Sequence, residues 1–256
     1  PGLHGRLEII NTYYPKRRSK RTRRLILFEN WKGKQFSDNL RAIDEELRRR
    51  RDRRKRLWVV RDHSVRMPAG VDTVLRFSPE YYDALARARW IVSNDSIDAS
   101  YVKRDDQTYL QTWHGTPLKK VGQDIEKVNF ARKGYLESFA SESAKWDYLV
   151  SPNAYSTDIM SRAFGVSQNM IINTGYPRND VFYSPTRQAR ADVTRARLGL
   201  RPDQSVILYA PTWRDDRYDD RGRYLFDLKL NVELLRERFG DSHVVLLRGH
   251  HLLATR

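Results

Sequence analysis

The chain has 256 residues, of which 39% are hydrophobic, and its six Trp, 14 Tyr and nine Phe supply large apolar side chains. This composition allows one large or two modest packed domains and excludes a wholly disordered chain. The absence of Cys excludes disulfides, thiolate metal ligands and a cysteine nucleophile, and no run of about 18 apolar residues is present that could cross a membrane.

The net charge of +16 indicates a polyanionic partner. Three classes of partner fit this charge: a nucleic acid, an anionic membrane surface and a phosphate-rich substrate. The positive charge is concentrated at residues 16–24 and 48–56, and a solvated helix face explains much of the second cluster. The residues of the first cluster for which we predict contact with a polymer or a membrane are Lys16, Arg17, Arg18, Lys20 and Arg21.

Short apolar runs alternate with helical patterns along the first part of the chain. Strands are predicted at residues 25–28, 57–60, 71–77, 90–93, 109–113, 148–150 and 170–172. Helices are predicted from residue 37 into the second basic cluster, from residue 78, and at residues 134–145 and 154–164. This alternation predicts a parallel sheet covered on both faces, in an α/β domain at residues 24–174 that follows a basic segment at residues 1–23.

A second α/β unit is predicted after a polar connection at residues 175–187. A helix that ends at residue 198 precedes a strand at 205–209, and a helix at 232–239 precedes a strand at 244–247. Two strands are too few for a doubly wound sheet, because sheets usually have about 4–6 strands. Residues 175–256 are therefore predicted to contain the connection and an incomplete second domain.

The first chemically suggestive segment is Gln-Thr-Trp-His-Gly-Thr-Pro-Leu-Lys-Lys at residues 111–120. His114 follows a predicted strand, at the end where ligands bind in open α/β sheets. An imidazole that titrates near neutral pH can take a proton from an alcohol. Gly115 permits close approach of a substrate, and Thr116 adds a hydroxyl. The alternative is a structural histidine that caps a turn, but the neighbouring Gly-Thr-Pro and paired Lys favour a functional role.

Two later segments also place polar residues after a strand. In the first, Thr212 and Arg214 are suited to hold phosphate, or else form a turn above a packed Trp213. In the second, Arg248 and His250 point the same way if the chain is extended. The paired histidines there have no third ligand at a suitable spacing, so no metal site is predicted.

Four motifs in order resemble the CDP-glycerol glycerophosphotransferase family, whose members build teichoic-acid-type polymers and related capsules. They are Trp-His-Gly-Thr-Pro-Leu-Lys at 113–119, Gly-Tyr-Pro-Arg-Asn-Asp at 175–180, Tyr-Ala-Pro-Thr-Trp-Arg at 209–214 and Arg-Gly-His at 248–250. The resemblance implies a GT-B-like fold of two Rossmann-like three-layer domains facing a cleft. It places His114 at the general base and His250 at a second catalytic histidine, which faces the donor phosphates together with Arg248. It also puts Thr212 and Arg214 in the donor domain.

The resemblance further implies the reaction and the partners. The expected donor is CDP-glycerol, the acceptor is a hydroxyl of a poly(alditol phosphate) or a lipid-linked primer, and no further cofactor is expected. The basic surface would bind the polyanionic acceptor and the inner, cytoplasmic face of the cell membrane. A later Asp-Tyr-Ser-Ser-like stretch of the family would follow His250 by many tens of residues, so we expect the chain to be a fragment.

Two other classes of function remain open on the sequence. The motifs do not distinguish glycerol from ribitol, so a CDP-ribitol or sugar-nucleotide transferase of the same fold is an alternative. A basic nucleic-acid-binding protein is disfavoured, because the chain contains no RNA-binding aromatic signature, helix-turn-helix or zinc module.

Overall fold

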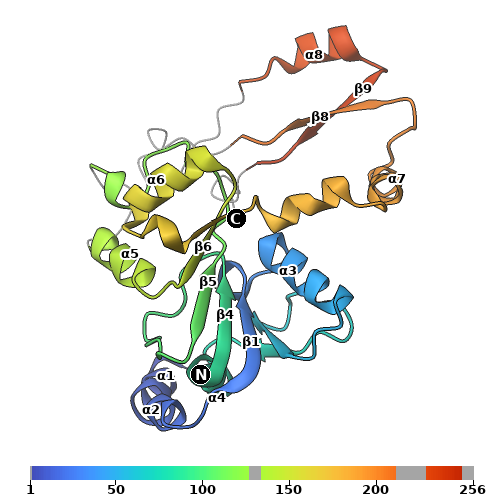
Figure 1. Ribbon diagram of the computed structural model, residues 1–256. Helices are drawn as coiled ribbons and strands as arrows, with labels where there is room; N and C mark the ends of the chain where they lie inside the picture. Colours follow the sequence, from blue (N-terminus) through green and yellow to red (C-terminus); the bar gives the residue numbers. More distant parts are fainter. Residues whose placement is uncertain (1, 127–133, 212–228, 250–256) are drawn as a thin grey trace. The chain divides into compact units, whose positions relative to one another are not determined.

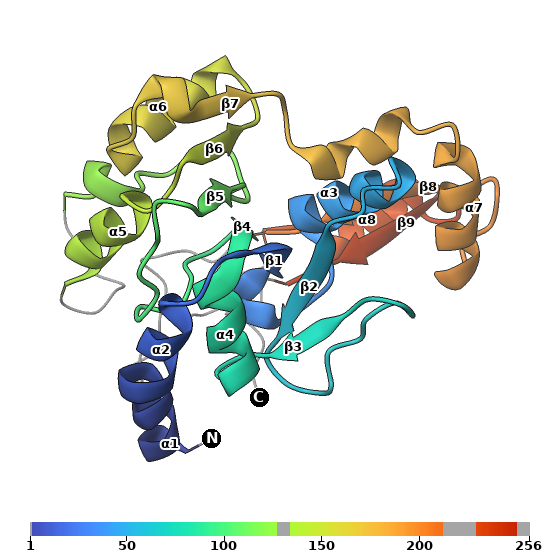
Figure 2. The same ribbon diagram turned by 60° about the horizontal axis from the view of Figure 1, so that its bottom comes forward.

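The computed structural model describes residues 2–126, 134–211 and 229–249 and divides the chain into two compact units, Pro1–Phe182 and Tyr183–Arg256. The first unit contains a seven-stranded sheet with the order β3-β2-β1-β4-β5-β6-β7 (Figure 1 and Figure 2). All neighbouring strands are parallel. The strands are β1 (Arg23–Glu29), β2 (Lys55–Val60), β3 (Thr73–Leu75), β4 (Ala88–Ser93), β5 (Thr108–Gln111), β6 (Tyr148–Ser151) and β7 (Ile171–Asn173).

The predicted α/β class with a parallel sheet is confirmed. The first six strands follow the order of a doubly wound Rossmann-type sheet, in which the winding reverses between β1 and β4. The α-helices after the N-terminal region are α3 (Asp38–Arg49), α4 (Pro79–Arg87), α5 (Tyr135–Ser143) and α6 (Ala154–Phe164). Short 3₁₀ segments are η2 (Trp31–Gly33), η3 (Gly122–Asp124), η4 (Gln168–Met170) and η5 (Pro177–Tyr183).

Helices cover both faces of this sheet. Side chains that alternate along β1 point to the two faces and are buried on each. Ile26 and Phe28 point to one face, where they form an apolar cluster with Leu40 of α3. Leu25 and Leu27 belong to the larger cluster on the other face, which α4 and α6 supply with aromatic and aliphatic side chains. A strand with both faces buried belongs in the interior of a three-layer α/β domain.

Residues 3–18 form helices that pack beside α4, as Figure 2 shows. These are α1 (Leu3–Glu8), a π-helical stretch η1 (Ile9–Tyr13) and α2 (Tyr14–Arg18). Tyr14 is only 3% exposed, and its ring lies 5.7 Å from that of Tyr82 in α4. Arg6 forms an ion pair with the buried Asp98 at 2.5 Å. Part of the predicted basic segment is therefore a packed part of the first unit.

Two strands end earlier than the sequence predicts. The strand predicted to reach residue 77 is β3, which ends at Leu75, and the one predicted to reach residue 113 is β5, which ends at Gln111. Phe77 and Trp113 have φ angles of +69° and +52°, which are incompatible with an extended strand. Large aromatic residues rarely adopt this conformation, so the residue types gave no sign of these breaks.

The second unit contains a two-stranded parallel sheet, in which β8 (Ser205–Tyr209) pairs with β9 (His243–Leu247). Its helices are α7 (Arg187–Arg197) and α8 (Val232–Phe239). Both strands and both helices match the predicted order. Asn231 caps α8 by accepting a hydrogen bond from the backbone N–H of Leu234 at 2.8 Å. Within the described ranges, no helix combines the length and the apolar character needed to cross a membrane.

Candidate active site

Buried polar side chains gather where β1 and β4 end in the first unit. Asn30 follows β1 and Asn94 follows β4, and both are fully buried. Ligands bind beyond the carboxyl ends of the strands at such a reversal of winding. Buried polar groups require hydrogen-bond partners, and Asn94 Oδ1 accepts one from the backbone N–H of Trp31 at 2.9 Å. This bond holds the Asn94 side chain against the loop that follows β1.

His114 reaches this edge from the loop that follows β5. Its Nδ1 lies 2.7 Å from the backbone oxygen of Asn94. A carbonyl oxygen can only accept a hydrogen bond, so the proton of the ring must be on Nδ1 for this bond to form. In the neutral imidazole, Nε2 then carries the lone pair. This arrangement gives His114 the tautomer that a general base needs, with Nε2 as the proton acceptor.

Two tryptophan rings enclose the imidazole. The ring of Trp113 is stacked with it at a centroid distance of 4.4 Å and an interplanar angle of 23°. The ring of Trp31 lies 4.6 Å away at an angle of 48°. The ring centroid of Trp113 also lies 4.6 Å from that of Phe164 in α6. This contact connects the site to the apolar core. These contacts limit rotation of the imidazole and reduce its hydration.

The backbone around His114 is strained at several positions. Trp31, Lys32, Asp38 and Trp113 have φ angles of +48°, +55°, +64° and +52°. Each such conformation in a residue other than glycine costs about 1–3 kcal/mol and persists only where the surrounding structure enforces it. Strained residues of this kind cluster at functional sites, so their gathering around one histidine supports a functional role for this edge.

The segment after β7 also contributes to the site. Arg178 Nη1 donates to the backbone oxygen of His114 at 3.0 Å and to Asp38 Oδ1 at 2.7 Å. Tyr176 is only 4% exposed, and its hydroxyl donates to the backbone oxygen of Gly115 at 3.0 Å. Burial raises the pKa of Tyr176 above its ordinary value, which keeps this hydroxyl a donor. The polar composition of this segment predicts a connection, although one of the family motifs covers it.

The other predicted site residues of this loop lie beside His114. Gly115 is half-buried, and no described atom comes within 4 Å of the place where a Cβ would stand. Open space therefore adjoins the backbone of Gly115. Thr116 is exposed. The substrate roles of both residues stay predictions.

The predicted donor-phosphate residues belong to the second unit. Arg248 is exposed and follows β9, where its backbone N–H donates to the oxygen of Tyr209 at 3.0 Å. Thr212, Arg214 and His250 lie outside the described residues. Their roles, and the expected cleft shared by His114 and His250, stay predictions.

The predicted polymer or membrane contacts lie in and after α2. Lys16, Lys20 and Arg21 are exposed, whereas Arg17 and Arg18 are half-buried. Arg17 forms an ion pair with Asp83 of α4. The exposed members of the cluster are therefore better placed to bind a polyanion than Arg17.

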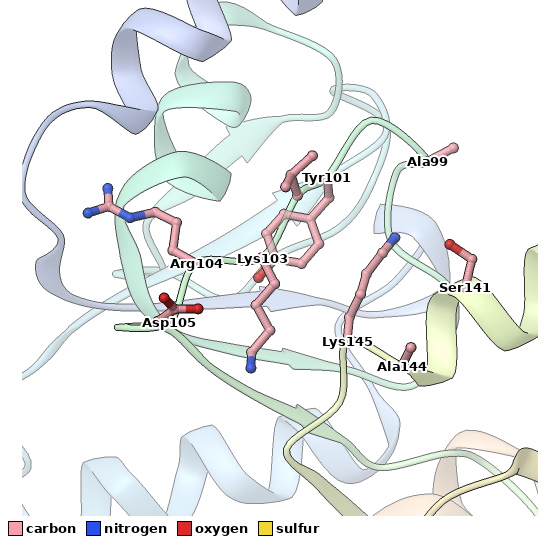
Figure 3. Close-up of a pocket in the computed structure, with 9 residues that line it drawn as sticks. Ala99, Tyr101, Lys103, Arg104, Asp105, Ser141, Ala144 and Lys145 are labelled. Atoms are coloured by element: carbon pink, nitrogen blue, oxygen red, sulfur yellow. The ribbon is translucent and has the colours of Figure 1, made fainter.

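A hollow of about 480 Å³ lies beside the loop that precedes β5 (Figure 3). His114 follows the other end of this strand. Its cations are paired: Lys103 Nζ lies 2.7 Å from Asp147 Oδ1 and Lys145 Nζ lies 3.2 Å from Glu142 Oε2. Because these carboxylates already pair with the cations, the positive charge at the hollow does not indicate an anionic ligand. Among the described side chains, no three of His, Asp and Glu converge as they would around a metal ion.

A doubly wound first unit followed by a second α/β unit defines the GT-B-like class of transferases. The comparisons with known proteins give the family. The sequence profile described as CDP-Glycerol:Poly(glycerophosphate) glycerophosphotransferase matches residues 12–256, and the chain belongs to this family.

Two characterised relatives are similar to nearly all of the chain. The teichoic acid poly(glycerol phosphate) polymerase of Bacillus subtilis (strain 168) is 41% identical over 237 residues, which are 91% of this chain and 32% of that protein. The teichoic acid glycerol-phosphate transferase of Staphylococcus aureus (strain NCTC 8325 / PS 47) is 42% identical over 239 residues, 91% of this chain and 61% of the relative. The chain thus spans about one third to three fifths of these relatives.

A solved structure shows the same fold. The structure of the wall teichoic acid polymerase TagF has a TM-score of 0.89 and 36% identity, and the match covers 98% of this chain and 62% of that one. Variants of TagF with a histidine replaced by asparagine or alanine have also been solved, one of them after soaking with CDPG.

Proposed function

We propose that the full-length protein transfers glycerol phosphate from CDP-glycerol to a hydroxyl of a teichoic-acid-type or capsule acceptor and releases CMP. Membership of the glycerophosphotransferase family supports the reaction. The names of the relatives support a poly(glycerol phosphate) product, and the soak of TagF with CDPG supports the donor. The observation that carries the proposal is the bond from His114 Nδ1 to the oxygen of Asn94, which leaves Nε2 as the basic nitrogen.

The proposed reaction requires a proton acceptor on the acceptor side. The acceptor oxygen attacks the phosphorus that bears glycerol, and the bond from this phosphorus to the bridging oxygen of the pyrophosphate breaks. CMP leaves with the electron pair of that bond, and the proton of the attacking hydroxyl moves to His114 Nε2. General-base assistance of this kind contributes about 10²–10⁴-fold to the rate.

The donor phosphates require positive charge and hydrogen-bond donors as negative charge shifts between oxygens. We assign this role to Arg248 and His250, assisted by Thr212 and Arg214. In this scheme residues 24–174 form the acceptor-side domain, and residues 175–256 contain the connection and a donor-side α/β unit.

The basic surface has two proposed partners in this reaction. A poly(alditol phosphate) acceptor carries one negative charge per unit, and an anionic membrane surface attracts the same cations. We propose that the protein acts at the inner face of the cell membrane, bound peripherally through exposed basic residues at positions 16–24.

A donor competition tests the proposed function. The full-length protein is given CDP-glycerol, CDP-ribitol or a UDP-sugar together with a lipid-linked glycerol phosphate acceptor. Released nucleotide and the mass of the acceptor are measured. We expect CMP release with CDP-glycerol and growth of the acceptor by glycerol phosphate units. Turnover of CDP-ribitol or the UDP-sugar in place of CDP-glycerol would favour the alternative transferases.

A further inference from the structure

Asp38, the first residue of α3, connects two different parts of the His114 site. Its Oδ1 accepts a hydrogen bond from Arg178 Nη1 at 2.7 Å, and its Oδ2 accepts one from Asn94 Nδ2 at 3.0 Å. The Asp38 side chain is only 7% exposed. Both bonds are therefore largely shielded from water, unlike the exposed ion pairs that contribute little to structure.

Each partner of Asp38 in turn holds His114. The backbone oxygen of Asn94 accepts from His114 Nδ1, and Arg178 Nη1 donates to the backbone oxygen of His114. One carboxylate thus fixes the residue that orients the imidazole and the residue that holds its main chain. The network joins positions that are 56 and 140 residues away from Asp38 in the sequence.

The backbone of Asp38 supports a role beyond that of an ordinary helix start. Its φ of +64° lies in the left-handed region, which Asp and Asn adopt more readily than most other residues. A carboxylate at the first turn of a helix interacts favourably with the helix dipole from an ordinary right-handed conformation as well. In this conformation the carboxylate accepts hydrogen bonds from Asn94, Arg178 and the backbone N–H of Asn39. Strained conformations persist where the surrounding structure enforces them in this way.

We infer that Asp38 is a positioning residue for the general base. It holds Asn94 and Arg178 so that the proton of His114 stays on Nδ1 and Nε2 stays directed to the acceptor hydroxyl. That Nε2 receives its proton from an acceptor hydroxyl rests on the proposed function. The coupling of Asp38 to the tautomer and orientation of the ring rests on the described contacts alone.

Asp44, on the same helix, provides a matched control. It is also buried, but its carboxylate contacts Arg48 Nε at 3.1 Å, Trp58 Nε1 at 3.2 Å and Arg56 Nε at 3.0 Å. None of these partners belongs to the His114 site. Asp44→Asn therefore represents the loss of a buried carboxylate that only stabilises the fold. Asp38→Asn represents the loss of a positioning carboxylate.

The test uses Asp38→Asn and Asp44→Asn in the full-length protein. Asparagine tolerates the left-handed backbone, but its amide offers only one acceptor oxygen, so it loses the bond to either Arg178 or Asn94. We expect Asp38→Asn to lower kcat between about 10- and 100-fold with less than about a twofold change in donor KM. Long-range ¹H–¹⁵N spectra of the His114 ring should show a loss of the form protonated on Nδ1. Asp44→Asn should lower the thermal midpoint and leave both readouts unchanged.

Two further variants keep the inference falsifiable. Arg178→Gln, at a half-buried position, should reproduce the kcat effect of Asp38→Asn if the latter does not fold. In a His114→Ala background, Asp38→Asn should have no additional effect on kcat, because the residue through which it acts is gone. An unchanged ring spectrum and kcat in folded Asp38→Asn would overturn the inference, as would a full additional loss in the His114→Ala background. Full activity of His114→Ala alone would instead refute the proposed base, while the ring spectrum would still report the coupling to Asp38.

Discussion

At the scale of single residues, the chemistry of His114 depends on the atoms that face its two ring nitrogens. The Asn94 oxygen fixes the proton on Nδ1, and the rings of Trp31 and Trp113 restrict the plane of the imidazole. An isolated histidine in a turn has neither constraint. The arrangement therefore favours a role as a base. A structural histidine would not need either ring nitrogen to remain available as a proton acceptor.

Replacement of His114 by alanine tests this assignment. In the full-length protein, His114→Ala should reduce kcat by about 10²-fold or more and leave donor binding nearly unchanged, because the general base is removed. Steady-state kinetics and donor titration on the same purified variant give both values. His63, an exposed histidine of the same unit, provides the control, and His63→Ala should have parental kinetics. A folded His114→Ala variant with parental kcat would contradict the mechanism.

At the scale of helices and strands, the periodicity of apolar residues predicted most elements. The candidate site is instead formed by loops with irregular backbone. The apolar runs of β1 and β4 and the apolar face of α3 are local patterns, and the structure contains these elements. The helices of the first 18 residues were not predicted, because their stability depends on packing of residues such as Tyr14 against α4. A short charged segment carries little sign of such a partner.

The candidate site was predicted only in part for a related reason. His114 and Gly115 stand in a recognisable motif after a strand. Asp38, Asn94 and Arg178 are spread along the chain, and only the order of the strands and the segment after β7 bring them together. Such contacts between distant residues leave no pattern in one sequence. The left-handed conformation of Asp38 was equally invisible, because Asp is a common first residue of an ordinary helix.

The loop between β1 and α3, which carries Trp31, depends on Gly33. Its φ is +78°, and a Cβ there would lie 2.7 Å from the backbone nitrogen of Arg61. Gly70 has a similar φ of +74°, but no described atom lies within 4 Å of its Cβ position. Gly70→Ala should cost about 1–2 kcal/mol through conformation alone. Gly33→Ala should cost more, because β2 must also shift, and thermal or urea unfolding measures the difference. Equal costs would show that the close approach to β2 is unimportant.

The turn between α3 and β2 should give stability a dependence on pH. Hydrogen bonds and the charge of Arg54 lower the pKa of Asp52, whose two oxygens accept from Arg54 Nε and Nη2 at 2.8–3.0 Å. A carboxyl pKa that is lower in the folded state stabilises the protein above the unfolded value of about 3.9, and this contribution is lost as pH falls through the folded pKa. Asp52→Asn should therefore reduce the free energy of unfolding at pH 7, and the difference should shrink as pH falls below the unfolded pKa of about 3.9. Urea unfolding at several pH values is the measurement. Arg54→Gln should show the same trend, and a pH-independent difference for both variants would contradict the assignment.

At the scale of the whole molecule, the chain has a net charge of +16. Some of its cations are paired with carboxylates, whereas others are exposed to solvent. Asp83 alone is approached by Arg17, Arg23 and Arg87, so one carboxylate is shared by three guanidinium groups. Lys16, Lys20 and Arg21 nearby are exposed. The end of the N-terminal region, in α2 and just after it, therefore carries exposed positive charge, in a family named for a poly(glycerophosphate).

Neutralisation of this exposed charge should weaken binding to anionic membranes. Each basic residue near an anionic surface contributes about 1 kcal/mol, and salt screens the attraction over a Debye length of about 8 Å at physiological ionic strength. Replacing Lys16, Lys20 and Arg21 by Gln in the full-length protein should thus reduce co-sedimentation with anionic vesicles at low salt, with little change for neutral vesicles. The control replaces Lys34, Arg53 and Arg66, which are also exposed, carry the same total charge and lie outside the N-terminal cluster. If both triple variants lose binding equally, net charge decides the interaction, and a specific role of the N-terminal cluster is refuted.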